Sequence, residues 1–503
     1  MRIKAKRTNA SEQSIEPLKI SGDLKVNEAN ILAAFEKCSD LVIRRFSLSD
    51  SITCLAVYLS VLIDESQWNE GVLEPLQKWD SKATENAVGL PERLKVILPF
   101  TAPPEILESL EEVVHRVIYS GVVLFFDSHQ TALAIPLTNQ KHRQLEEPKT
   151  EAVIRGPRYG FVEDLSVNLA LLRQIIRSPQ LKIERLTVGK LSKTDVAVVY
   201  VEGYAVQSLV EEIKNRISKI DMDTVIESGY IEELVRDHPY SPFPTSQATE
   251  RPDTAAASLV VGRVLVLVNG TPMTLLMPIT FWYGFQSVED YYMSFLFGTV
   301  LRWLRFLFAF FALVLPSVYV AITTFHQEMI PTSLALSLAN AREIVPFPAM
   351  IEILMMEATF EALREAGVRL PRPVGQTISI VGALVIGQAA VQAGIISAPI
   401  IIVVAMTGIA SFLIPHTGMS QVFSILRFPL VILGGTLGLY GVSAGVIAIL
   451  IHLSQLESLG LPYLWPLAPF NRAGLEDVFA RAPWQFMSKR QQHIQLRKEL
   501  EKR

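Results

Sequence analysis

The stretch FLFAFFALVLPSVYVAITTF, residues 306–325, decides the class of fold to which this chain belongs. It holds no charged residue and reaches the length of about 20 apolar residues that an α-helix needs to cross a bilayer. Trp303 lies just before it, flanked by Arg302 and Arg305, and this group suits the interface between membrane and water. Residues 306–325 are therefore predicted to form a transmembrane helix.

Two further uncharged segments follow toward the carboxyl end. Residues 377–415 form a run of nearly twice that length, with breaks near Gly394 and Pro399. Residues 428–451 form another run that is long enough to cross a bilayer. We therefore expect an α-helical polytopic membrane domain over residues 301–455.

The ends of the chain bear on the number of crossings. From Asn471 onward the tail carries eight Lys or Arg against four Asp or Glu, which favours the cytoplasmic side. The amino-terminal end has no apolar signal-peptide region, so we expect the amino-terminal half in the cytoplasm as well. An even number of crossings follows, and residues 346–363 decide how it is reached. If they cross, 377–415 makes one net crossing, and if they do not, 377–415 crosses twice; we favour a crossing or re-entrant segment.

Strand-like and helix-like patterns alternate through the amino-terminal half. GVVLFFDSHQTALAIPL (121–137) predicts a hairpin that turns at Asp127–His129, and Asn269-Gly270 predicts a second hairpin. We expect an α/β cytosolic region of two lobes, whose patterns suggest distant repeats of one strand–helix unit. The expected parts are a disordered amino terminus at 1–23, lobe 1 at 24–138, a linker at 139–160, lobe 2 at 161–238, a proline-rich connector with a β-hairpin at 239–300, the transmembrane domain at 301–455 and a basic cytoplasmic tail at 456–503.

Motifs for catalysis and for cofactor binding are absent from the sequence. It contains no phosphate-binding glycine loop, no nucleophile elbow and no HExxH zinc motif. The eight histidines show no metal-ligand spacing, and Cys38 and Cys54 cannot form a CxxC site. A net charge of −4 argues against a nucleic-acid partner. We expect no enzyme activity, no cofactor and no metal site, and we attribute the arginines and acids of 146–177 to salt bridges between lobes rather than to a ligand site.

Three glutamates in an otherwise apolar helix are the candidate functional residues. An ionised carboxylate in hydrocarbon costs at least about 2.5 kcal/mol, so such residues usually face protein or water. Acids repeated around a ring attract cations, while apolar side chains form a collar that gates by dewetting. The alternative is an interfacial helix that lies flat with solvated acids. The candidate pore-lining residues are Glu352, Glu357 and Glu361 as polar lining and Leu354, Met355 and Ala358 as the collar.

Longer motifs point to a known family. In order along the chain they include EPKTEAVIRGPRYGFVEDLSVNLALLR (147–173), SGYIEELVRDHPYSPFPTSQATERPD (228–253), VPFPAMIEILMMEATFEALREAGVRLPRPVG (345–375) and LGLPYLWPLAP (459–469). Together they resemble the A subunits of the GerA-type nutrient germinant receptors of endospore-forming bacteria. The resemblance runs from about residue 35 to about residue 484.

The resemblance implies one subunit of a three-protein receptor in the spore inner membrane. Its partners would be a permease-like B subunit that senses the nutrient and a C lipoprotein. The resemblance further implies that A subunits form a homo-oligomeric, nutrient-gated channel that releases monovalent cations. The family also has an A-like branch that is associated with dipicolinate release. The alternatives from other functional classes are a non-conducting scaffold for the B and C subunits and a secondary transporter.

Overall fold

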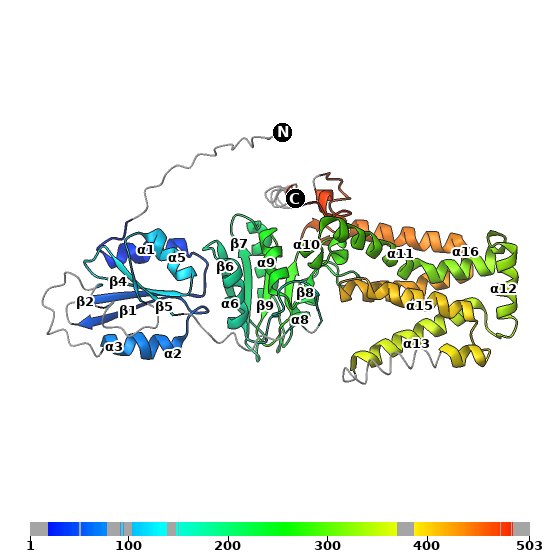
Figure 1. Cartoon of the computed structure of the whole chain (residues 1–503), viewed down its shortest axis with the longest axis horizontal. Coiled ribbons are helices and arrows are strands. Elements are labelled where there is room, and N and C mark those ends of the chain that lie inside the picture. The colour runs from blue at the N-terminus through cyan, green and yellow to red at the C-terminus, as the bar shows by residue number, and fades with distance from the viewer. Residues whose placement is uncertain are drawn as a thin grey trace. The chain divides into compact units, whose positions relative to one another are not determined.

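The computed structural model describes residues 19–49, 52–77, 91, 94, 103–137, 147–148, 150–369, 387–472, 474–483 and 485 (Figure 1). Most of the expected disordered amino terminus, part of the linker, the start of the 377–415 run and the last residues of the basic tail lie outside these residues. The chain divides into two compact units. The first unit holds both α/β lobes, and the second holds the long apolar helices of the carboxyl-terminal part.

The first lobe is a five-stranded sheet with the order β1-β2-β4-β5-β3. Its strands pair antiparallel, and the predicted hairpin at Asp127–His129 is confirmed, since Gly121 of β4 lies opposite Pro136 of β5. A capping box starts α5, in which Ser109 and Glu112 satisfy each other's backbone N–H groups. The elements are α1 (Leu24–Ala34), β1 (Leu41–Ser49), β2 (Ile52–Leu59), α2 (Glu65–Trp68), a π-helical turn (Asn69–Leu73), α3 (Glu74–Gln77), β3 (Glu105–Leu107), α5 (Leu110–Ile118), β4 (Gly121–Phe126) and β5 (Ala132–Pro136).

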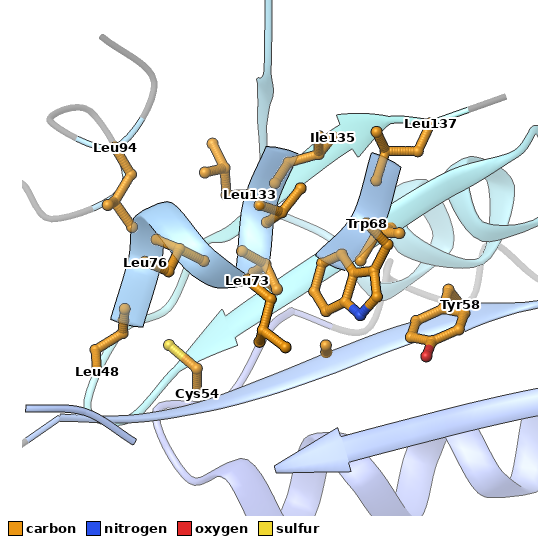
Figure 2. Close-up of a cluster of buried hydrophobic side chains, with 14 of the residues drawn as sticks. Leu48, Cys54, Tyr58, Trp68, Leu73, Leu76, Leu94, Leu133, Ile135 and Leu137 are labelled. Carbon is orange, nitrogen blue, oxygen red and sulfur yellow. The ribbon is translucent and has the colours of Figure 1, made fainter. Parts of the chain in front are cut away.

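The core of the first lobe lies between this sheet and the short helices α2 and α3. Figure 2 shows Trp68 from α2 beside Tyr58 of β2, and their ring centroids are 5.6 Å apart. Cys54 of β2 is fully buried in the same cluster. Burial of such aromatic and aliphatic side chains stabilises the lobe by roughly 1.5–3 kcal/mol for each one that is fully covered.

The second lobe repeats the architecture of the first. Its sheet has the order β6-β7-β9-β10-β8, which is the same order with the strands renumbered. The predicted hairpin at Asn269-Gly270 is confirmed: it joins β9 to β10, and Gly270 has a φ of 97° that favours glycine. The elements are α6 (Leu165–Ile175), β6 (Leu181–Val188), β7 (Thr194–Val201), α7 (Gln207–Ser218), α8 (Ser228–Val235), β8 (Gln247–Thr249), α9 (Pro252–Val260), β9 (Val264–Val268) and β10 (Thr274–Met277).

The second lobe extends further along the chain than the range 161–238 predicted from sequence. Strands β8, β9 and β10 lie in the 239–300 range that the sequence analysis assigned to a connector with a hairpin. They complete the second sheet, so the sheet continues to Met277. The expected fold class, an α/β region of two lobes followed by a helical region, is confirmed.

The two lobes are joined by an ion pair with no exposed surface. Arg173 of α6 donates to both carboxylate oxygens of Asp40, each at 2.9 Å, and both side chains are fully buried. Backbone hydrogen bonds run beside it from Ser39 N–H to the Ile183 carbonyl and from Ile183 N–H to the Lys37 carbonyl. For Arg173, the expected salt bridge between the lobes is confirmed.

The second unit is mainly helical. Two of its described helices, α11 and α16, are long and apolar enough to cross a membrane, and α15 is a shorter apolar helix. The predicted spans 306–325 and 428–451 lie within α11 and α16. The elements are a 3₁₀ turn (Phe281–Phe285), α10 (Glu289–Tyr292), α11 (Phe295–Phe325), a second 3₁₀ turn (Gln327–Met329), α12 (Thr332–Arg342), α13 (Ala349–Arg369), α15 (Ala398–Phe412), α16 (Thr417–Gln455), the short strands β11 (Glu457–Ser458) and β12 (Leu461–Pro462), and a last 3₁₀ turn (Gly474–Asp477).

Helix α16 is a hairpin of two helices. Gly438 has a φ of 62° and a ψ of −150°, a conformation that is almost confined to glycine. A Cβ atom on Gly445 would lie 2.5 Å from the Leu430 side chain, whereas 15 residues of straight helix would separate the two by roughly 22 Å. The chain therefore reverses at Gly438, and residues 439–455 run back along residues 417–437.

Candidate functional site

Helix α13 carries all six candidate pore-lining residues. It starts after the sequence PFP at 346–348, and the Pro348 carbonyl accepts hydrogen bonds from the N–H groups of Ile351 and Glu352. Ala349 and Ile353 pack against α11, α15 and α16 in one buried cluster. One face of α13 is thereby fixed in the helical bundle.

Glu352 lies on this fixed face and has no exposed surface. Its Oε2 atom accepts a hydrogen bond of 2.8 Å from the Ser397 N–H, and Ser397 is the N-cap residue of α15. Its Oε1 atom lies 3.5 Å from Arg342 Nε. A carboxylate is favoured at this position because the N-terminus of a helix carries partial positive charge.

Glu357 is also buried and forms an ion pair with Arg427 of α16. Thr407 of α15 donates to the same carboxylate at 3.2 Å, and Arg427 Nε donates to the Ala312 carbonyl of α11 at 2.7 Å. The pair therefore links four helices. Arg427 was not among the candidate residues, although the sequence marks it as the sole Lys, Arg, Asp or Glu between residues 417 and 455.

Glu361 is the most exposed of the three candidate glutamates. Its side chain is 44% exposed and pairs with Arg364, which also donates to Ser424 at 3.1 Å. Ala358 is exposed, while Leu354 and Met355 are half-buried. The structure thus divides the six candidates between a packed side, with Glu352 and Glu357, and a more open side, with Ala358 and Glu361.

The outer surface of the bundle contrasts with this charged interior. Large apolar side chains of α15 and α16 are exposed, among them Ile402, Phe412, Ile425 and Tyr440. A soluble fold places such groups inside and its charges outside. Here the ion pairs are inside, which is the distribution expected of a helical bundle in lipid.

A second buried charge cluster lies at the start of α11. Arg302 has no exposed surface and lies 3.4 Å from Asp290 and 3.1 Å from Asp477, while Arg305 lies 2.8 Å from Asp290. The prediction that these arginines serve as interfacial anchors is therefore wrong for Arg302, because it is buried and paired with Asp290 and Asp477. Burial raises the pKa of Asp477, and it raises the pKa of Tyr291, which donates to the Asp477 carboxylate, well above its usual value.

In the first unit, two of the motifs that carry the family resemblance meet. Thr249 donates to Glu151 at 2.6 Å, and an Arg251 guanidinium N–H donates to the Glu151 carbonyl at 3.3 Å. Burial raises the pKa of Glu151. This network accounts for Glu151 and Arg251 as internal hydrogen-bond partners. Among the described residues, no group of three or more His, Cys, Asp or Glu side chains is placed to hold a metal ion.

Comparisons with known proteins agree on one family. Residues 29–493 match the family model described as the Bacillus/Clostridium GerA spore germination protein. The chain is 44% identical to the uncharacterized membrane protein YfkQ of Bacillus subtilis, over 94% of this chain and 91% of that protein. It is 42% identical to spore germination protein KA of the same organism, over 96% of this chain and 89% of that protein. It is 41% identical to spore germination protein GerLA of Bacillus cereus, over 91% of this chain and 92% of that protein.

One solved structure resembles part of the chain. It is the crystal structure of the N-terminal domain of the A subunit of the Bacillus megaterium spore germinant receptor GerK3. The sequences are 28% identical, and the match covers 52% of this chain and 96% of that domain with a TM-score of 0.42.

Proposed function

Because this chain belongs to the Bacillus/Clostridium GerA spore germination protein family, we propose that it works as the A subunit of a nutrient germinant receptor. In this proposal copies of the chain assemble in the spore inner membrane into a nutrient-gated channel for monovalent cations. A permease-like B subunit and a C lipoprotein are its partners. It is not an enzyme in this proposal, and the cytosolic lobes provide contacts between subunits.

The membrane location is supported by the distribution of apolar and charged side chains. The bundle exposes Ile402, Ile425 and Tyr440 while it pairs Glu357 with Arg427 inside. An exposed apolar surface of this kind is stable in lipid and unstable in water. In the proposed multi-pass topology, the amino-terminal half and the carboxyl-terminal tail are both cytoplasmic.

The hairpin at Gly438 adds two crossings to the proposed topology. At 1.5 Å per residue its two arms are roughly 31 Å and 25 Å long, close to the roughly 30 Å thickness of the hydrocarbon core. The two arms together make two crossings and return the chain to the side of the membrane on which residue 417 lies. In this topology α11 crosses once and α13 brings the chain back, so the 377–415 run contributes an even number.

The pore wall in this proposal is the open side of α13. Ala358 and Glu361 supply a small and an acidic side chain, and the half-buried Leu354 and Met355 form the collar. Glu352 and Glu357 hold α13 against the bundle through their internal partners. The single observation that supports this most directly is the division of α13 into a locked side and an open side.

The test is cysteine scanning along 346–366 in membranes that contain the full receptor. We expect aqueous thiol reagents to label Ala358→Cys and Glu361→Cys, and Ala358→Cys to crosslink between identical subunits. The buried Ile353→Cys is the matched control and is expected to stay unlabelled. One-sided labelling of the whole segment without crosslinks would mean a helix that lies on the membrane surface.

A non-conducting scaffold is the second candidate function. The internal neutralisation of Glu352 and Glu357 favours it, because a scaffold needs paired charges and no conducting path. Glu361→Gln separates the two functions. A channel predicts altered monovalent-ion release from spores with normal amounts of receptor, and a scaffold predicts unchanged release.

A further inference from the structure

Four buried polar atoms near the start of α13 have no hydrogen-bond partner among the described residues. They are Glu352 Oε1, Ser397 Oγ, Arg342 Nε and the Tyr319 hydroxyl. Arg342 Nε lies 3.5 Å from Glu352 Oε1, and the Ser397 N–H binds the other oxygen of the same carboxylate. Tyr319 is within electrostatic reach of both Arg342 and Glu352. Buried polar atoms are rarely left without partners, so four such atoms in one region form a candidate binding site.

The three oxygen-bearing residues belong to a firm framework. Tyr319 precedes Val320 on α11, Glu352 precedes Ile353 on α13, and Ser397 follows Ile396. These three apolar neighbours are all buried in one cluster. The oxygens are therefore held by three packed segments.

Arg342 is held much less firmly. It lies in the last turn of α12, a helix with no buried residue. Its side chain is 25% exposed, and its Nε group is close to Glu352 without forming a hydrogen bond. Segments with few buried contacts open at low free-energy cost. The positive charge next to Glu352 is thus on a helix without buried residues.

The Glu352 carboxylate needs a positive partner whenever it is ionised. It has no exposed surface, and an unpaired buried charge is strongly destabilising. A site built from this carboxylate and the two hydroxyl groups would be rich in oxygen and would carry a single negative charge. Hard cations prefer oxygen ligands, and divalent sites usually contain more carboxylates than this one.

We propose that Glu352, Ser397 and Tyr319 form a binding site for a monovalent cation such as K⁺ or Na⁺, which Arg342 blocks with its own positive charge in this conformation. The guanidinium and the ion compete for the same carboxylate. The inference deepens the proposed channel function and rests on it for a role in ion release. In that role, movement of α12 exchanges the arginine for a monovalent cation behind the pore wall.

The experiment measures binding without measuring conductance. The full chain is purified in lipid nanodiscs, and its thermal midpoint is compared in KCl, in NaCl and in N-methylglucamine chloride at equal ionic strength. In Arg342→Gln we expect K⁺ or Na⁺ to raise the midpoint by roughly 1–3 °C over N-methylglucamine, as for a ligand at about ten times its Kd. The shift should be absent in Arg342→Gln/Glu352→Gln and in the control Arg364→Gln, which breaks the more exposed pair with Glu361.

Several results would overturn the site. A shift of the same size in the double variant or in Arg364→Gln would mean a general salt effect, and no shift in Arg342→Gln would mean that the region holds water only. If Arg342→Gln folds poorly, the yield of monodisperse protein replaces the midpoint. Recovery in K⁺ or Na⁺ but not in N-methylglucamine supports the site, and equal loss in all three salts contradicts it. Ion flux through wild-type protein in vesicles is measured separately, so the channel proposal and the cation site can fail independently.

Discussion

At the scale of single residues, the decisive feature of this protein is charge neutralised inside an apolar bundle. Glu357 meets Arg427, which is 70 positions away in sequence, and Glu352 meets Arg342 and the start of α15. Both glutamates were recognised from sequence as unusual in an apolar helix. Their partners were not, because helical periodicity describes one helix and says nothing about which helix packs against it.

Loss of Arg427 should have a large effect on stability. In Arg427→Met the Glu357 carboxylate stays buried without its ion-pair partner, so we expect a loss of about 3–5 kcal/mol in unfolding free energy. Thermal unfolding of the full chain in detergent measures it. Adding Glu357→Gln should restore most of the loss, because the variant pair then carries no buried charge.

The matched control is Arg364→Met. This arginine pairs with a 44% exposed glutamate, and exposed pairs contribute about 0–1 kcal/mol. Equal losses for Arg364→Met and Arg427→Met would contradict the assigned role of the buried pair.

At the scale of elements, the hairpin in α16 is the feature with the widest consequences. From sequence, residues 428–451 look like one span, because both arms are apolar and a lone glycine does not reveal a reversal. The backbone of Gly438 shows two arms instead. In the proposed topology, one additional arm changes the parity of the crossings, so the alternatives for 377–415 exchange: if α13 crosses, that run crosses an even number of times.

Gly438→Ala tests the reversal. A Cβ atom there would lie 3.0 Å from His326 Nε2 and 3.1 Å from the Phe325 Cβ atom, in a conformation that side chains rarely adopt. We expect a loss of about 1–3 kcal/mol in stability from the backbone conformation alone. Reduced protein level and a lower thermal midpoint would be the readouts.

Gly387→Ala provides the comparison. Its added Cβ atom would lie 3.8 Å from the Ile401 side chain, which is ordinary contact. We expect little change in the midpoint. A Gly438→Ala variant that is as stable as Gly387→Ala would mean that the chain does not reverse there.

At the scale of the whole molecule, the amino-terminal unit consists of two α/β lobes of the same strand order, joined by a buried ion pair and by backbone hydrogen bonds. The two sheets share their strand order, and Asp40 and Arg173 join the lobes. Cys38 lies beside this junction, where its thiol donates to the Leu181 carbonyl, while Cys54 lies in the core of the first lobe. Burial raises the pKa of both thiols, so neither is reactive in the closed fold.

The reaction rate of Cys38 with a thiol reagent measures opening of the junction between the lobes, and that of Cys54 measures unfolding of the first lobe. In Arg173→Met the buried Asp40 loses its partner, so we expect the lobes to separate more often and Cys38 to react with a thiol reagent at least tenfold faster. Cys54 should react at the wild-type rate, which mass spectrometry of labelled peptides measures. Arg185→Met, which changes an exposed arginine of β6, is the control. Faster reaction of both cysteines in Arg173→Met would mean unfolding of the first lobe rather than opening of the junction.

Local patterns in the sequence were enough to predict an apolar helix and two hairpins. The uncharged run at 306–325 predicted an apolar helix, and the turn residues at 127–129 and 269–270 predicted two hairpins, because such signals act between neighbours in sequence. The longer motifs between residues 147 and 469 were enough to predict the family. Tertiary structure alone decided that β8, β9 and β10 complete the second sheet and that α16 folds back on itself. It also decided that Glu352 and Glu357 are paired within one chain, since burial and ion pairing depend on packing between segments far apart in sequence.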